Sequence, residues 1–156
     1  MFRIRFLRPP GAGAEKDFLA RCIQCGQCAQ VCPYDSIVLG TGFSLTRSGT
    51  PLIYPRSVPC YLCMRCPEVC PSEALRPVPM QDVKMGKADL DRSLCFVYAE
   101  DVICRVCFEL CPLKGRAVIH TSGIYPVITE HCVGCGVCEY VCPKRCITTI
   151  PAWFTT

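Results

Sequence analysis

Seventeen cysteines stand in this chain of 156 residues, and sixteen of them fall into four repeats. Each repeat contains Cys-x2-Cys-x3-Cys-Pro, preceded by a further cysteine three positions earlier, or nine positions earlier in the third repeat. The four motifs are Cys22, Cys25, Cys28 and Cys32; Cys60, Cys63, Cys66 and Cys70; Cys95, Cys104, Cys107 and Cys111; and Cys132, Cys135, Cys138 and Cys142. This spacing is typical of thiolates that hold a 4Fe–4S cluster, with the fourth cysteine reaching the neighbouring cluster. The sequence therefore predicts four 4Fe–4S clusters, with iron bound through these sixteen cysteines.

Three other interpretations of the cysteines fit less well. Structural zinc prefers Cys-x2-Cys pairs separated by a longer loop, and a disulfide framework belongs to an oxidising compartment. A catalytic thiol needs a partner base, and His120 and His131 are the only histidines of the chain. We therefore expect an electron carrier with no catalytic residue of its own.

Composition limits the binding partners and the cellular compartment that we expect for this carrier. The formal net charge of +4 counts the cysteines as neutral, so bound clusters would make the holoprotein more anionic. No dense stripe of Lys and Arg indicates nucleic-acid binding, and no run approaches the ~20 apolar residues of a membrane span. The start MFRIRFLR lacks the apolar core of a signal peptide. These features predict a cytoplasmic protein, or a periplasmic one if a leader has been removed, with membrane contact only through a partner.

The context of the motifs repeats as well, and it predicts the fold class. A short polar step, a small residue and apolar residues follow the last cysteine, as in Ser36-Ile37 and Ala74-Leu75. Pieces of β-prone sequence precede the second and fourth motifs, at 51–54 and 125–129. This order of strand, cluster loop, helical turn and strand predicts an α+β chain with a double two-cluster ferredoxin-like fold. Cys146 occupies the small slot of the fourth motif, where we expect a buried small hydrophobe rather than a spare ligand.

The pairing of the motifs has two solutions, sequential or nested. Motifs one and four share a glycine after the second cysteine, Gly26 and Gly136, which favours nesting. In one compact unit, 1–156, the nested prediction joins 1–39 and 120–156 into an outer half around an inserted half, 40–119. Its ligand sets are Cys22, Cys25, Cys28 and Cys142; Cys132, Cys135, Cys138 and Cys32; Cys60, Cys63, Cys66 and Cys111; and Cys95, Cys104, Cys107 and Cys70.

The segments between and outside the motifs give weaker predictions. Residues 76–94 read as a linker with helical turns around 81–87, or alternatively as a partner-contact loop, and 40–58 reads as a hairpin. Phe2, Ile4 and Phe6 alternate with arginines in a strand pattern, which we assign to the chain's own sheet rather than to a partner's edge. The apolar tail 150–154 suits docking onto the chain's own core or onto a partner.

Three stretches of the chain also resemble a known family. RPPGAGAEKDFLARCIQCGQCAQVCPYDSI, VPCYLCMRCPEVCPSEAL and CRVCFELCPLKGRAV closely resemble the NapG/MauM-type polyferredoxins, over residues 8–145. The resemblance implies four 4Fe–4S clusters in a double ferredoxin-like fold, an electron-transfer role, and a ligand role for all sixteen cysteines.

The resemblance also implies partners. NapG-type members usually carry an export signal and work beside a membrane partner. The chain is also similar to the small iron–sulfur subunits that accompany tungsten-dependent aldehyde oxidoreductases. Without a visible signal, we expect a subunit that relays electrons between a tungsten- or molybdenum-dependent oxidoreductase and a second partner, such as a flavin subunit. The alternatives are a ferredoxin that passes electrons from a quinol-linked membrane partner to a reductase, and a scaffold or maturation protein. Self-association into an extended wire is a further expectation.

Overall fold

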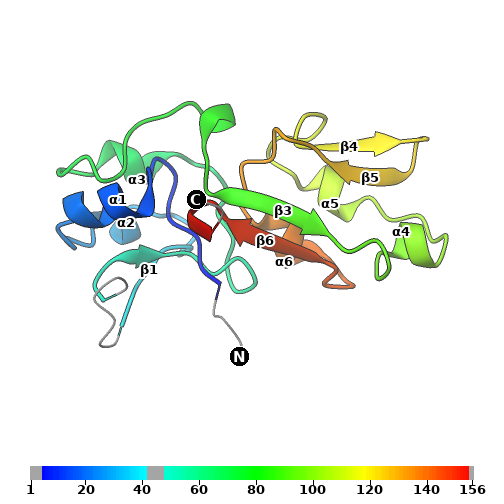
Figure 1. Ribbon diagram of the computed structural model, residues 1–156, viewed down its shortest axis with the longest axis horizontal. Helices are drawn as coiled ribbons and strands as arrows, with labels where there is room; N and C mark the ends of the chain where they lie inside the picture. Colours follow the sequence, from blue (N-terminus) through cyan, green and yellow to red (C-terminus); the bar gives the residue numbers. More distant parts are fainter. Residues whose placement is uncertain (1–4, 42–47, 155–156) are drawn as a thin grey trace.

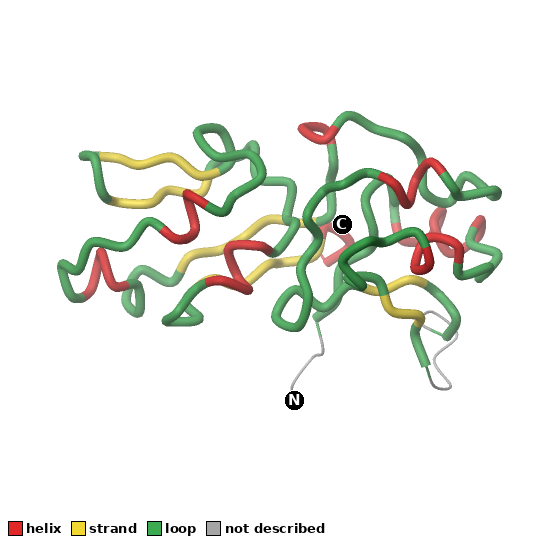
Figure 2. Tube along the Cα trace, turned by 180° about the vertical axis from the view of Figure 1, so that it is seen from behind, coloured by secondary structure: helices red, strands yellow, loops and turns green. Residues whose placement is uncertain are grey.

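The chain folds into two halves that follow one another along the sequence (Figure 1). The computed structural model describes residues 5–41 and 48–154. Elements of the first two motifs gather at one end of the long axis, and those of the last two gather at the other. Seen from behind, short helices and strands are joined by loops that make up much of the chain (Figure 2).

In its described residues, the N-terminal half contains only short elements. They are α1 (Glu15–Arg21), α2 (Gln27–Gln30), β1 (Val38–Leu39), β2 (Pro51–Leu52), α3 (Arg65–Glu68) and the 3-10 turn η1 (Met80–Asp82). Strands β1 and β2 pair antiparallel over two residues each. Single bridges join Leu7 to Ile53 and Ala12 to Leu75. The half therefore has little regular sheet.

The C-terminal half has longer strands. It contains β3 (Gly86–Leu90), α4 (Phe96–Ala99), α5 (Val106–Glu109), β4 (Val118–Thr121), β5 (Tyr125–Ile128), α6 (Val137–Val141), β6 (Ile147–Pro151) and the 3-10 turn η2 (Ala152–Phe154). Strand β3 pairs with β6 over five residues, with Ala88 opposite Thr149. Strand β4 pairs with β5 over four residues.

Both halves have the same pairing plan. The segment before the first motif of a half pairs with the segment after its second motif: Ala12 with Leu75 in one half, β3 with β6 in the other. The segment after the first motif pairs with the segment before the second: β1 with β2, and β4 with β5. The nested division, 1–39 with 120–156 around 40–119, would require β1 to leave β2. The structure instead divides the chain sequentially.

The segment between the halves differs from the prediction of a linker. A helical turn is present at Met80–Asp82, but Gly86–Leu90 forms strand β3 rather than continuing it. The run GKADL has little strand character of its own. It becomes a strand because the C-terminal segment of the chain, β6, lies beside it. Local sequence could not supply that partner.

The C-terminal tail packs on its own chain. The ring of Trp153 stacks on Phe6 with centroids 4.7 Å apart, and its Nε1 donates a hydrogen bond to the Phe6 carbonyl at 3.3 Å. Phe6 is buried, but the described residues 5–7 form a single bridge, Leu7 to Ile53, instead of the predicted strand. Phe2, Ile4 and the centre of the predicted hairpin, 42–47, lie outside the described residues.

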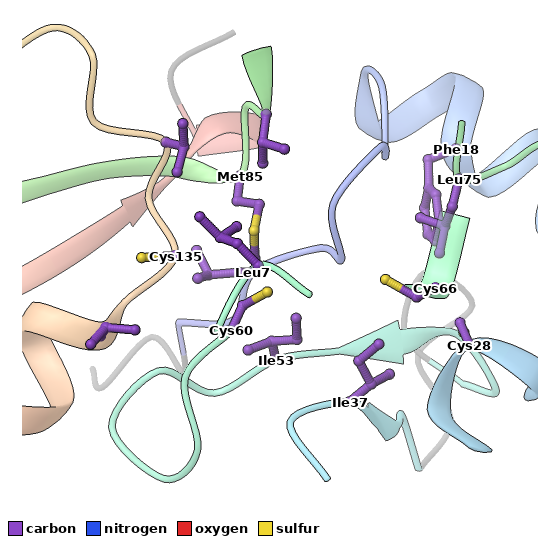
Figure 3. Packing of buried hydrophobic residues seen from close by; sticks show 14 of the residues in the cluster. Leu7, Phe18, Cys28, Ile37, Ile53, Cys60, Cys66, Leu75, Met85 and Cys135 are labelled. Atoms are coloured by element: carbon purple, nitrogen blue, oxygen red, sulfur yellow. The ribbon is translucent and has the colours of Figure 1, made fainter. Parts of the chain in front are cut away.

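The larger hydrophobic core runs across the junction of the halves. It contains Leu7, Ile53 and Leu75 from the first half and Met85 and Val133 from the second. Figure 3 shows that cysteine side chains lie among these apolar side chains, with Cys60 and Cys135 at the same part of the core. Within the residues that the structure describes, no helix has the length and apolar character needed to cross a membrane.

Candidate iron–sulfur sites

The backbone around the second cysteine of three motifs is left-handed on both sides. Positive φ values occur at Gln24 and Gly26, at Leu62 and Met64, and at Gly134 and Gly136, which flank Cys25, Cys63 and Cys135. Alternating left- and right-handed residues turn successive N–H groups into a concave, anion-binding surface, as in many iron–sulfur sites. Each of these three motifs therefore has a backbone suited to an anionic cluster.

The third motif lacks this arrangement. Arg105, after its second cysteine, has a φ of −125°. The longer segment between Cys95 and Cys104 contains α4, and its positive φ falls earlier, at Asp101. The extra residues thus change how the loop approaches its site without changing the number of cysteines.

A short helix carries the third cysteine of every motif. Cys28, Cys66, Cys107 and Cys138 lie in α2, α3, α5 and α6 respectively. A proline follows the fourth cysteine of each motif. Proline has no N–H with which to continue the helix, so the chain turns away there and the fourth cysteine faces a different site.

Four cavities are each lined by four cysteines of the motifs. Site 1 contains Cys22, Cys25, Cys28 and Cys70; site 2 contains Cys60, Cys63, Cys66 and Cys32; site 3 contains Cys95, Cys104, Cys107 and Cys142; site 4 contains Cys132, Cys135, Cys138 and Cys111. Sites 1, 3 and 4 each contain about 350 Å³ of space that is partly open to solvent, and site 2 contains about 310 Å³. Four thiols around similar cavities fit four cubane clusters.

The structure groups the fourth cysteines differently from the nested prediction. It places Cys70, rather than Cys142, beside Cys22, Cys25 and Cys28. It places Cys142 at site 3, where the nested prediction had Cys70. Cys32 lies at site 2 instead of Cys111, and Cys111 lies at site 4 instead of Cys32.

The shared glycine misled the prediction because it marks a backbone conformation rather than a partner. Gly26 and Gly136 have φ values of 75° and 85°. Met64 occupies the same left-handed region in motif two, with a φ of 60°. Motif two thus adopts the conformation without glycine, and likeness at this position does not tell which motifs pair.

Contacts between helices set the order of the sites. Helix α2 packs against α3, and α5 packs against α6, so site 1 adjoins site 2 and site 3 adjoins site 4. At the junction of the halves, the N–H of Cys60 donates a hydrogen bond to the carbonyl of Cys135 at 3.0 Å. Site 2 therefore adjoins site 4, and the order along the molecule is 1, 2, 4, 3.

Burial and mutual repulsion disfavour the thiolate forms of the cavity cysteines when no cation is bound. Burial raises the pKa of Cys28 and Cys107 to about 11 and that of Cys60 and Cys135 to about 12, and neighbouring cysteines add to each shift. Such thiols hold their protons at neutral pH unless a cation replaces them, and a coordinating thiol is deprotonated outright. Within 5–41 and 48–154, no group of three or more His, Cys, Asp and Glu side chains lies close enough together to hold a single metal ion.

Cys70 lies in a different electrostatic environment. Burial would raise its pKa, but the N–H of Leu75, 3.4 Å from its Sγ, and the hydroxyl of Ser72 lower the pKa below its usual value. Sequence reasoning did not find these contacts. Both donors lie within five residues of Cys70. The sequence feature that could have predicted these contacts is therefore the tight turn after Pro71.

Comparison with known proteins agrees with these sites. The chain matches the model of a 4Fe-4S dicluster domain over residues 21–74 and that of a 4Fe-4S binding domain over residues 125–148. It is 40% identical over 151 residues to the methylamine utilization ferredoxin-type protein MauM of Paracoccus denitrificans, covering 88% of this chain and 67% of the relative. The chain belongs to the MauM/NapG-type ferredoxin family. The ferredoxin-type protein NapG of Escherichia coli is 39% identical over 152 residues, covering 87% of this chain and 65% of that protein.

Family membership settles the cofactor and the general role. The chain is a ferredoxin-type electron carrier with four 4Fe–4S clusters. The dicluster match at 21–74 contains every cysteine of sites 1 and 2, in agreement with the sequential division. The chain spans about two thirds of the length of these relatives.

Proposed function

We propose that the chain relays single electrons between two redox proteins, through its clusters in the order site 1, 2, 4, 3. The hydrogen bond between Cys60 and Cys135 carries this proposal, because it joins the two cluster pairs end to end. The proposed ligands are the cysteines that line each cavity. The protein supplies spacing, burial and hydrogen bonds, and the clusters supply the redox chemistry.

The exposure of the outer sites supports electron entry and exit there. Ile23, beside Cys22 of site 1, is 63% exposed, and Ile103, beside Cys104 of site 3, is 73% exposed. A contiguous exposed apolar patch marks a protein contact site, and Val102, next to Ile103, is 47% exposed as well. At site 4, Cys135 and Cys138 are buried, whereas Cys25 of site 1 and Cys63 of site 2 are exposed. A partner at each end of the molecule would approach sites 1 and 3.

For the partners, we propose a catalytic oxidoreductase with a tungsten or molybdenum cofactor at one end and a second redox protein, such as a flavin subunit, at the other. This assignment rests on the resemblance of the sequence to the small subunits of tungsten enzymes, and it includes a cytoplasmic setting. The alternative is a quinol-linked membrane partner that delivers the electrons, which the resemblance to NapG-type members implies.

The native complex tests both parts of the proposal. Anaerobic isolation followed by metal analysis should give about sixteen irons per chain, together with tungsten or molybdenum from the partner. Iron with only a membrane protein attached would replace the proposed partner by the quinol-linked one.

A ligand variant separates an electron relay from a scaffold. Cys28→Ala should leave the complex assembled but stop dye reduction through it, with Lys16→Ala on the exposed face of α1 as the control. Undiminished electron transfer through a chain shown to hold three clusters would overturn the relay. Loss of the complex itself would support a scaffold.

A further inference from the structure

One buried slot recurs after the last cysteine of three motifs, and it holds a different side chain each time. The slot lies four residues after Cys32, Cys70 and Cys142. It is filled by Ser36, Ala74 and Cys146, which are 4%, 5% and 5% exposed. In each motif the preceding residue has a positive φ: Asp35 at 52°, Glu73 at 56° and Arg145 at 51°. The turn is thus the same, and only the side chain in the slot changes.

The three side chains differ in what they contact. Ser36 lines the cavity of site 2, and its Oγ donates to the carbonyl of Pro59 at 2.7 Å. Ala74 has no polar atom to donate. The Sγ of Cys146 lies 3.4 Å from the Sγ of Cys142 and lines the cavity of site 3 with its four cysteines.

Cluster binding decides which sulfur of this pair donates. A cysteine that ligates iron is a thiolate and has lost its proton. Cys142 can then only accept, so the S–H of Cys146 becomes the donor of the pair. No other position of the recurring slot provides a side-chain donor to a ligand sulfur.

We propose that Cys146 is a positioning residue that raises the reduction potential of the cluster at site 3 through its hydrogen bond to Cys142. Reduction adds negative charge to the cluster and its thiolates, and a donor to a ligand sulfur stabilises that charge. Hydrogen bonds to the sulfurs are among the features that set cluster potentials. The inference rests on the proposed function, because it concerns the terminal cluster of the relay. There, Cys146 favours the arrival of an electron.

Redox titration of substituted chains, followed by electron paramagnetic resonance under anaerobic conditions, tests this role. The cluster of site 3 is identified as the one missing from Cys104→Ala. In Cys146→Ala, iron per chain should be unchanged and the midpoint potential of that cluster should fall. The expected change in its reduced-to-oxidised ratio is up to about tenfold, or about 59 mV for a one-electron couple.

Matched variants separate the hydrogen bond from packing. Cys146→Ser keeps a donor and should restore at least part of the shift. Ala74→Cys puts the same thiol four residues after Cys70 and should raise the midpoint of the cluster at site 1. Ser36→Ala removes a hydroxyl that donates to a carbonyl rather than to a sulfur, and it should leave the midpoint of the cluster at site 2 unchanged.

Two results would overturn the inference. An unchanged midpoint in Cys146→Ala with four intact clusters would show that the thiol does not act on the cluster. Iron loss in both Cys146→Ala and Cys146→Ser would instead make Cys146 a ligand. Failure of the proposed function would give a different result: the clusters of the wild-type chain could not be reduced or would not pass electrons on.

Discussion

The two halves of the molecule have the same pairing plan but differ greatly in their strands. In the N-terminal half, the outer pairing is one bridge at Ala12 and the inner pairing is a ladder of two residues per strand. The corresponding ladders of the C-terminal half have five and four residues per strand. Each half nevertheless forms two similar four-cysteine cavities. Regular sheet is therefore not what shapes the cluster sites. The loops of the motifs have that role.

A buried arginine stabilises the half that has little sheet. Arg8 is 4% exposed; it donates to Glu15, to the Thr50 hydroxyl at 2.9 Å and to the Pro51 carbonyl at 3.0 Å. Its guanidinium lies 4.7 Å from the centre of the Phe18 ring. In the C-terminal half, the ion pairs of Arg105 with Glu109 and of Lys144 with Glu100 are largely exposed. The C-terminal half also has a buried carboxylate, Glu139, which accepts from the Thr149 N–H at 2.6 Å and from Arg56 of the N-terminal half at 2.8 Å. The halves therefore differ more in their strands than in their buried charges.

Paired ligand substitutions test whether the halves are separate. With sequential sites, Cys22→Ala combined with Cys70→Ala damages only site 1 and leaves about three intact 4Fe–4S clusters. Cys22→Ala combined with Cys142→Ala damages sites 1 and 3 and leaves about two. Mössbauer spectroscopy of anaerobic protein counts the intact clusters, and Cys22→Ala alone is the baseline. The opposite ranking of the two double variants would restore nested pairing.

Removal of Arg8 should weaken the N-terminal half strongly. Arg8→Met leaves Glu15, which is 25% exposed, without its cation and removes the hydrogen bonds that Arg8 donates to Thr50 and Pro51. Because Glu15 is partly solvated, we expect a loss near the low end for broken buried pairs, about 3 kcal/mol. Anaerobic guanidinium unfolding, followed by cluster absorbance, measures it. Glu15→Gln keeps acceptor and shape and should cost about 1 kcal/mol; equal losses in the two variants would contradict the role of the charge.

Replacing Gly26 or Gly136 by methionine, the residue that motif two has at this position, should destabilise the two halves by different amounts. A Cβ at Gly136 would lie 2.5 Å from the Pro55 side chain, whereas one at Gly26 meets only Leu39, at 3.4 Å. Gly136→Met adds overpacking to backbone strain and should cost about 2 kcal/mol more than Gly26→Met. The same unfolding measurement compares them, with Met64→Gly as the reverse control. Equal costs would mean that Pro55 moves freely.

The smallest effect is expected on the surface of the C-terminal half. Glu109 is 50% exposed and pairs with Arg105 and Lys114 at 3.4 and 3.7 Å. Exposed ion pairs contribute little and are screened by salt, so Glu109→Gln should change unfolding by less than about 0.5 kcal/mol. A loss comparable with that of Arg8→Met would show that both halves depend on ion pairs.

The sequence predicted the cofactor and the elements near it because their signal is local. Cysteine spacing identified the sixteen cysteines that line the four cavities, and β-prone runs predicted strands β2 and β5. The small slot predicted the burial of Cys146, which is 5% exposed. None of these inferences required knowledge of a distant contact.

The pairing of the motifs depended on information that is not local. Strand β3 exists because β6 lies beside it, and the grouping of the fourth cysteines follows from which strands pair. The left-handed backbone at Met64 could not be anticipated, because a methionine rarely adopts it without a surrounding structure that requires it. For the same reason, the glycines at the matching positions, Gly26 and Gly136, did not indicate which motifs pair.

The contiguity of each half bears on how the protein is made. Cys70 is the last ligand in the proposed sets of sites 1 and 2, and Cys95 is the first cysteine that follows it. A growing chain on the ribosome thus has both ligand sets of the first half before any ligand of the second half has been synthesised. Domains generally fold as units, N-terminal first, during synthesis. Two clusters can be inserted at this stage, and the finished first half then offers Cys60 as a docking point for the second.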